Sequence, residues 1–98
     1  MECNQVALDA RLVKRGALRY TPAGIPVIDL LVGHKSIQLE AGTEREARCE
    51  VDAVAVGDLA AKLNRAKLNQ PLRLSGFLTQ RSVKDRNLVL HVVNAAPL

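Results

Sequence analysis

The stretch of sequence that decides the fold is Thr21-Pro22-Ala23-Gly24-Ile25-Pro26, together with the run that it opens, from Val27 to Gly42. The prolines and the glycine predict a rigid turn, because proline restricts φ and glycine adopts conformations that other residues avoid. Apolar Ile28, Leu30 and Val32 then occupy every second position, which is the period of a β-strand. The sequence therefore predicts a turn that leads into a strand, followed by a second bend at Glu40-Ala41-Gly42.

Length and composition indicate one small β-rich domain with an aliphatic core. The chain has 98 residues, of which 48% are hydrophobic but only 2% aromatic. This length suffices for one domain, residues 1–98, and is too short for two. The formal net charge of +4 and the pI of about 9.5 favour an anionic partner.

Nothing in the sequence predicts a disulfide framework, a leader or a membrane span. The two cysteines, Cys3 and Cys49, are too few for a disulfide scaffold. The first residues, Met-Glu-Cys-Asn, lack the basic and apolar regions of a signal peptide. No apolar run approaches the ~20 residues that a membrane helix needs. We therefore expect a reduced, cytoplasmic protein that does not span a membrane.

The apolar period predicts five strands and one helix. Between the third and fourth strands the spacing changes, with Leu59, Leu63 and Ala66 four and three residues apart. Asp58 is expected to cap this helix, which should end near Asn69 because a proline follows at position 71. The strands are expected at residues 6–12, 27–36, 48–56, 72–78 and 88–95, with loops at 39–46 and 80–87.

Three strands, one helix and two strands is the element order of the OB fold, an all-β five-stranded barrel with one short helix. In that fold, oligonucleotides bind to the face of strands two and three and to the loops that join strands one–two and four–five. Both loops are cationic here, and the residues concerned are Lys14, Arg15 and Arg19 in the first and Arg81, Lys84 and Arg86 in the second. This coincidence favours a binding surface for a polyanion.

At this point the chain resembles the bacterial primosomal replication protein N family (PriB), which is related to the single-stranded DNA-binding proteins. The resemblance covers nearly the whole chain and depends on the order of several short motifs. These motifs are Pro22 to Pro26, His34-Lys35-Ser36, Glu40-Ala41-Gly42, Cys49, Gly76-Phe77 and Val89-Leu90-His91.

The resemblance implies an OB-fold homodimer that binds single-stranded DNA and assists the restart helicase PriA at stalled replication forks. By position it implies binding residues at the end of strand two, at the start of strand three and in both cationic loops. With Lys14 and the stacking candidate Tyr20 added, the predicted nucleic-acid-binding residues are Lys14, Arg19, Tyr20, Lys35, Arg48, Arg81, Lys84 and Arg86.

One departure from the family concerns the aromatic residues of the binding face. Members of the family can place aromatics in the region of strands two and three, where this chain has Thr43 and Arg48, and it has no tryptophan. Stacking on an aromatic contributes ~1–3 kcal/mol per base. We therefore expect weak binding dominated by phosphate contacts, with Tyr20 or the Arg48 guanidinium as stacking groups. Phe77 is expected in the core, in the opposite layer of the barrel.

The sequence predicts neither a metal site nor an enzyme active site. Two cysteines and two histidines offer zinc ligands, but they lack the close pairs that zinc sites use. No glycine-rich phosphate loop is present. A nuclease would need two of the scattered strand carboxylates to converge, and the candidates are Asp9, Asp29, Glu50 and Asp52. We expect a binding protein without a cofactor or metal.

Two further functions stay open from the sequence. A general single-stranded DNA-binding protein recruits partners through an acidic C-terminal tail, and residues 94–98 carry no acidic residue. The other is a protein-binding OB adaptor with weak nucleic-acid affinity, which the small number of aromatics favours.

Overall fold

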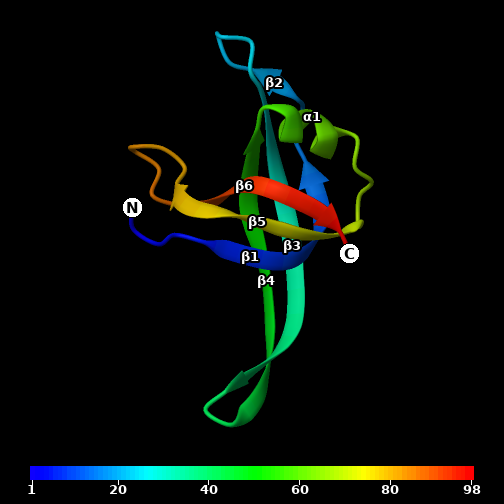
Figure 1. Ribbon diagram of the computed structural model, residues 1–98, viewed down its shortest axis with the longest axis vertical. Coiled ribbons are helices and arrows are strands. Elements are labelled where there is room, and N and C mark those ends of the chain that lie inside the picture. Colours follow the sequence, from blue (N-terminus) through cyan, green and yellow to red (C-terminus); the bar gives the residue numbers. More distant parts are fainter.

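A long β-hairpin runs through the structure and extends beyond the barrel as an arm (Figure 1). In the computed structural model, which describes residues 1–98, β3 (Pro26–Glu40) and β4 (Thr43–Val56) pair antiparallel from Val27↔Val56 to Glu40↔Thr43. The predicted bend is confirmed: Ala41 and Gly42 both have positive φ, 51° and 80°, as a two-residue hairpin turn requires. The predicted loop at 39–46 was wrong, because so tight a turn lets both strands continue to its edge. Arg48 accordingly lies within β4, not at its start.

The predicted five-stranded barrel is confirmed, with β1 (Val6–Arg15), β5 (Pro71–Gln80) and β6 (Leu88–Pro97) completing it. The strand order is β1-β5-β6-β4-β3, and pairing of β1 with β3 closes the barrel. All pairings are antiparallel except β4 with β6. A short strand that the sequence did not predict, β2 (Arg19–Tyr20), pairs with the start of β3. Lys14 belongs to β1 and not to the loop after it, because β1 bends at a bulge and continues along β3.

The helix is shorter than predicted. It spans α1 (Asp58–Asn64), where Ala60 and Leu63 are buried against the barrel. Asp58 is not a cap, since Gly57 occupies that position with φ of 81° and no side chain caps the helix. The chain leaves the helix early because the backbone N–H of Asn69, with φ of 64°, donates to the Leu12 carbonyl at 2.7 Å. At seven residues, this only helix is too short to cross a membrane.

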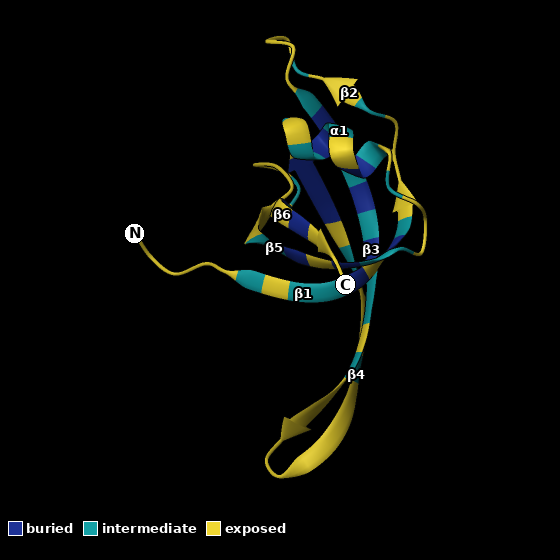
Figure 2. Cartoon of the chain, turned by 45° about the vertical axis from the view of Figure 1, so that its right-hand side comes forward, coloured by how far each residue is buried: buried dark blue, intermediate teal, exposed yellow.

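The core lies inside the barrel and leaves the arm without a core of its own (Figure 2). Its largest fully buried side chains come from four strands and the helix. They are Leu12, Ile28, Val32, Leu63, Leu74 and Leu90. By contrast, every residue of the arm from position 37 to 46 is exposed. The barrel is therefore the folded unit, and the arm is a projecting hairpin.

An irregularity between β5 and β6 determines which side of the barrel Phe77 occupies. The register moves from Ser75↔Asn94 to Gly76↔Val92, so Val93 is an extra residue on β6. The alternation of β5 is uninterrupted: Leu74 points inward, and Phe77 points outward beside its partner on β6. The expectation that Phe77 is a core residue was wrong, because the bulge lies on the neighbouring strand. Phe77 is 39% exposed, and its ring stacks on His91.

Candidate nucleic-acid interface

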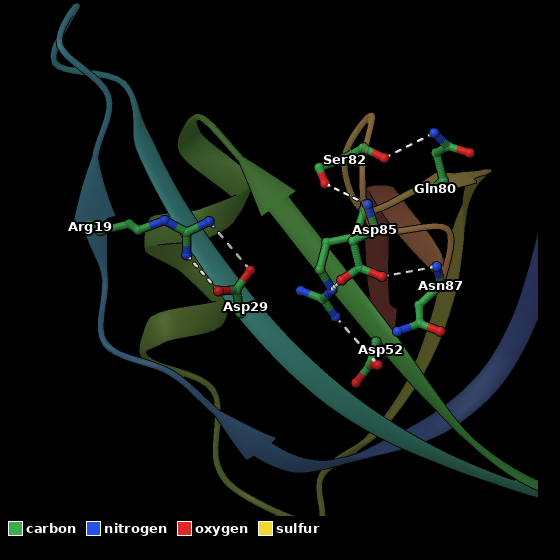
Figure 3. A network of polar contacts seen from close by, with 8 residues as sticks. Arg19, Asp29, Asp52, Gln80, Ser82, Asp85 and Asn87 are labelled. Carbon is green, nitrogen blue, oxygen red and sulfur yellow. Dashed lines mark hydrogen bonds and ion pairs between the residues drawn. The ribbon is translucent and has the colours of Figure 1, made fainter.

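The outward side chains of β3 and β4 form a face that two cationic elements flank. Because the inward positions of both strands are in the core, their neighbours Asp29, Leu31, Asp52 and Val54 point to the outside of the barrel. We call these four residues the outer face. Figure 3 shows β2 on one side of it and the loop of residues 81–87 on the other. This arrangement matches the oligonucleotide-binding region of OB folds.

Arg19 on β2 is held by a carboxylate of the outer face. Its Nη1 donates to Asp29 Oδ2 at 2.7 Å and its Nη2 to Oδ1 at 3.4 Å, and both side chains are about half exposed. Tyr20, the next residue, is 64% exposed. The bidentate pair fixes the guanidinium over β3, where a phosphate would have to compete with Asp29.

Arg81 begins the opposite flank and makes two ion pairs. Its Nη2 lies 3.3 Å from Asp52 Oδ2, and its Nε lies 3.5 Å from Asp85 Oδ2. The loop is also fixed from within, since the Asp85 N–H donates to Ser82 Oγ at 2.9 Å and the Asn87 N–H to Asp85 Oδ1 at 3.1 Å. These contacts order the loop that carries Lys84 and Arg86.

A hollow of about 280 Å³ lies at the outer face. Lys14, Asp29, Asp52 and Arg81 all line it. Lys14 reaches this position because it pairs with Leu31 across β1 and β3. The structure thus brings Lys14 and Arg81 together at one hollow, with Arg19 attached through Asp29.

Lys35 and Arg48 form a second cationic position at the base of the arm. They are cross-strand partners, and both bind Glu46 Oε1, Lys35 Nζ at 3.3 Å and Arg48 Nη2 at 3.1 Å. These hydrogen bonds, from Arg48 first and then Lys35, lower the pKa of Glu46 below its ordinary value. The two residues also line a hollow of about 640 Å³. Arg48 precedes Asp52 by four residues, roughly 13 Å along the strand.

The charge of the interface is smaller than the cations alone suggest. Four of the seven predicted basic residues, Arg19, Lys35, Arg48 and Arg81, form ion pairs with carboxylates. The remaining three have no carboxylate within 4.0 Å, and they are Lys14, Lys84 and Arg86. Exposed ion pairs are weak, so a phosphate can displace them, but each displacement lowers the net gain.

Sequence analysis missed the carboxylates that share this face. Asp29 and Asp52 were considered only as possible metal ligands, although the strand period already placed both at outward positions. In the structure no three His, Cys, Asp or Glu side chains cluster as a metal site would require. His34 is also engaged, with Nδ1 2.6 Å from the Asp9 carbonyl and Nε2 2.7 Å from Ser36 Oγ.

Comparison with known proteins agrees with this geometry. Residues 4–94 match a family model described as another single-strand binding protein family. The replication restart protein PriB of Bordetella pertussis is 38% identical over 92 residues, which cover 94% of this chain and 86% of the relative. That of Nitrosomonas europaea is 33% identical over 89 residues, covering 91% and 82%.

Solved structures of PriB and of a single-stranded DNA-binding protein are also similar to this chain. The PriB protein of Ralstonia solanacearum superimposes with a TM-score of 0.88 at 32% identity, covering 98% of both chains. The single-stranded DNA-binding protein of Thermus aquaticus gives a TM-score of 0.77 at 26% identity, covering 98% of this chain and 50% of that one.

The fold and the outer face define an OB-fold binding protein, and the chain belongs to the single-strand binding protein family. Within it, the relatives of highest identity above are replication restart proteins PriB, as the sequence motifs predicted. These families consist of binding proteins and not enzymes.

Proposed function

We propose that this protein binds single-stranded DNA across the outer face during replication restart, and that it assists the restart helicase PriA there. The strand would lie between β2 and the 81–87 loop, with its phosphates on the basic residues of both flanks. The observation that carries the proposal is the convergence of Lys14 and Arg81 at one hollow on the face that OB folds use, with Arg19 bound to Asp29, which also lines the hollow.

Binding on this surface should depend strongly on salt. For single strands, the slope of log affinity against log salt is about −0.7 per phosphate neutralised. With three unpaired cations, we expect a slope of roughly −2. Replacing Lys84 and Arg86 with alanine should reduce it to about −0.7 and weaken binding to all sequences alike. Fluorescence anisotropy with labelled oligo-dT measures both quantities.

The control is the double variant Arg65→Ala and Lys67→Ala, which removes the same charge just after α1. We expect it to keep the original slope, apart from a small effect of net charge. Duplex DNA and an RNA of equal length show whether the surface selects single-stranded DNA. An unchanged slope in the Lys84→Ala, Arg86→Ala variant would exclude the loop from the site.

We also propose that two copies associate through β1. Residues 6–11 of β1 pair with β5, whereas β3 pairs only with residues 11–15, so the other edge of the first half of β1 is unpaired. Such an edge readily accepts another strand. Sedimentation equilibrium at micromolar concentration should give twice the monomer mass of 10.6 kDa. A single species at the monomer mass would contradict the dimer.

The arm favours a second candidate function, that of a protein-binding adaptor. Ile37 and Leu39 are 62% and 73% exposed, and they share a face with Glu44 and Glu46. An apolar strip beside acidic residues suits a protein partner better than a phosphate chain. Helicase binding that persists without measurable oligo-dT binding would support this function over the first.

A further inference from the structure

Phe77 and His91 form an exposed aromatic stack on the outside of the barrel. Their ring centroids are 5.1 Å apart, and the rings are inclined by 15°. They face each other as direct partners on β5 and β6. A stack that served only the core would be buried, whereas Phe77 is 39% exposed.

This stack continues the outer face across the sheet. Asp29 pairs with Val54 on β4, Val54 pairs with His91 on β6, and His91 pairs with Phe77 on β5. The four residues therefore form one row of outward side chains over four adjacent strands. With strands ~4.8 Å apart, Phe77 lies roughly 14 Å from the position where Asp29 holds Arg19.

The backbone around Phe77 is held on both sides of β5. On one side it pairs with β6. On the other, the Asn4 amide makes two hydrogen bonds with the backbone of Leu78, donating to its carbonyl at 2.8 Å and accepting from its N–H at 2.9 Å. A ring on so constrained a backbone loses little freedom when a flat ligand stacks on it.

We propose that the Phe77–His91 stack is a nucleobase-stacking subsite for the single strand bound at the outer face. This inference rests on the proposed function, to which it adds a base contact beside the phosphate contacts. Apolar side chains surround the stack: Val89 lies in the row nearer the 81–87 loop, and the exposed Val93 lies beyond His91. Arg19 and Arg81 are attached to carboxylates of β3 and β4, toward the other end of the row, so the phosphates of a strand bound there can lie beside a base on Phe77.

The test compares Phe77→Leu with the unsubstituted protein on two ligands. Leucine keeps an apolar side chain but removes the ring. On oligo-dT we expect the affinity to fall roughly 5- to 150-fold, the range that corresponds to ~1–3 kcal/mol per stacked base. The salt slope should not change, because no cation is lost. On an abasic oligomer with the same number of phosphates, the two proteins should bind equally.

Two further variants keep the test decisive. Leu68→Ala alters an exposed apolar side chain between α1 and β5, and it should leave both ligands unaffected. Phe77→Trp should tighten binding to oligo-dT, and it provides the answer if Phe77→Leu does not fold.

The outcomes separate this inference from the proposed function. Equal losses on oligo-dT and on the abasic oligomer, or no loss on either, would overturn the stacking subsite while leaving phosphate binding in place. A lack of oligo-dT binding by the unsubstituted protein would overturn the proposed function, and the subsite with it.

Discussion

The Gly76→Ala variant is expected to be strongly destabilised or unfolded. A Cβ atom at this position would lie 1.8 Å from the His91 carbonyl oxygen and 2.8 Å from its carbon. Both are backbone atoms, so no rotation of a side chain relieves the clash, and β5 must separate from β6 beside buried Leu74 and Val92. We expect a loss of about 3 kcal/mol, the upper end for overpacking, which lowers Tm by roughly 12–24 °C in a domain of this size.

Gly33→Ala is the matched control, since this glycine also lies in a strand with no positive φ. Its added Cβ would lie 3.1 Å from Val13 Cγ2, a methyl group that can move. Thermal denaturation followed by circular dichroism should show a small change for Gly33→Ala and a large one for Gly76→Ala. Similar melting temperatures for the two variants would refute the close approach of β5 and β6 at this point.

The double variant Asp29→Asn, Asp52→Asn is expected to bind single-stranded DNA more tightly. It removes the carboxylate that holds Arg19 and one of the two that hold Arg81. The Arg19 guanidinium and the Nη2 group of Arg81 then become available to phosphates, while Arg81 Nε still pairs with Asp85. At low salt we expect a gain of roughly 30-fold, about fivefold for each arginine, as ~1 kcal/mol per contact implies. The salt slope should steepen by about 1.4.

Titration with oligo-dT over a range of salt concentrations measures this gain. The pair Glu40 and Arg45 near the tip of the arm, with 2.6 Å between Oε1 and Nη1, supplies the control substitution Glu40→Gln. A similar gain from Glu40→Gln would mean that only net charge matters. No gain from the double variant would show that phosphates do not reach Arg19 and Arg81.

The spacing of apolar residues predicted the elements of the barrel, with a period of two for the strands and of three to four for the helix. This was possible because the inward positions of the strands are aliphatic almost without interruption. Ile28, Leu30 and Val32 all reach the core as the alternation indicates. The length of the arm was not predictable in this way. Both faces of the arm are exposed, so no alternation of apolar and polar residues marks its strands. The turn at Ala41-Gly42 was predicted from the sequence. The continuation of both strands up to this turn was not.

The basic residues of the site were predicted from their positions in the sequence, whereas their ion pairs with carboxylates were not. Arg19, Lys35, Arg48 and Arg81 all occupy the expected region, yet each is paired with a carboxylate, which for Arg48 is the nearby Glu46 on its own strand. Arg19, Lys35 and Arg81 pair with a carboxylate that is distant in the sequence or on a neighbouring strand. Such pairs depend on register, which the sequence does not give. Phe77 illustrates the same limit, because only the pairing shows that the bulge lies at Val93 on β6 and not at Gly76 on β5.

The most direct test of single-strand binding at the outer face is an amide chemical-shift titration of the 98-residue protein with oligo-dT. We expect the largest shifts in three groups of residues, at positions 19–20, 29–31 and 81–87, with additional shifts at Asp52 and Val54. Shifts confined to α1 and to the tip of the arm would place the strand elsewhere and contradict the account.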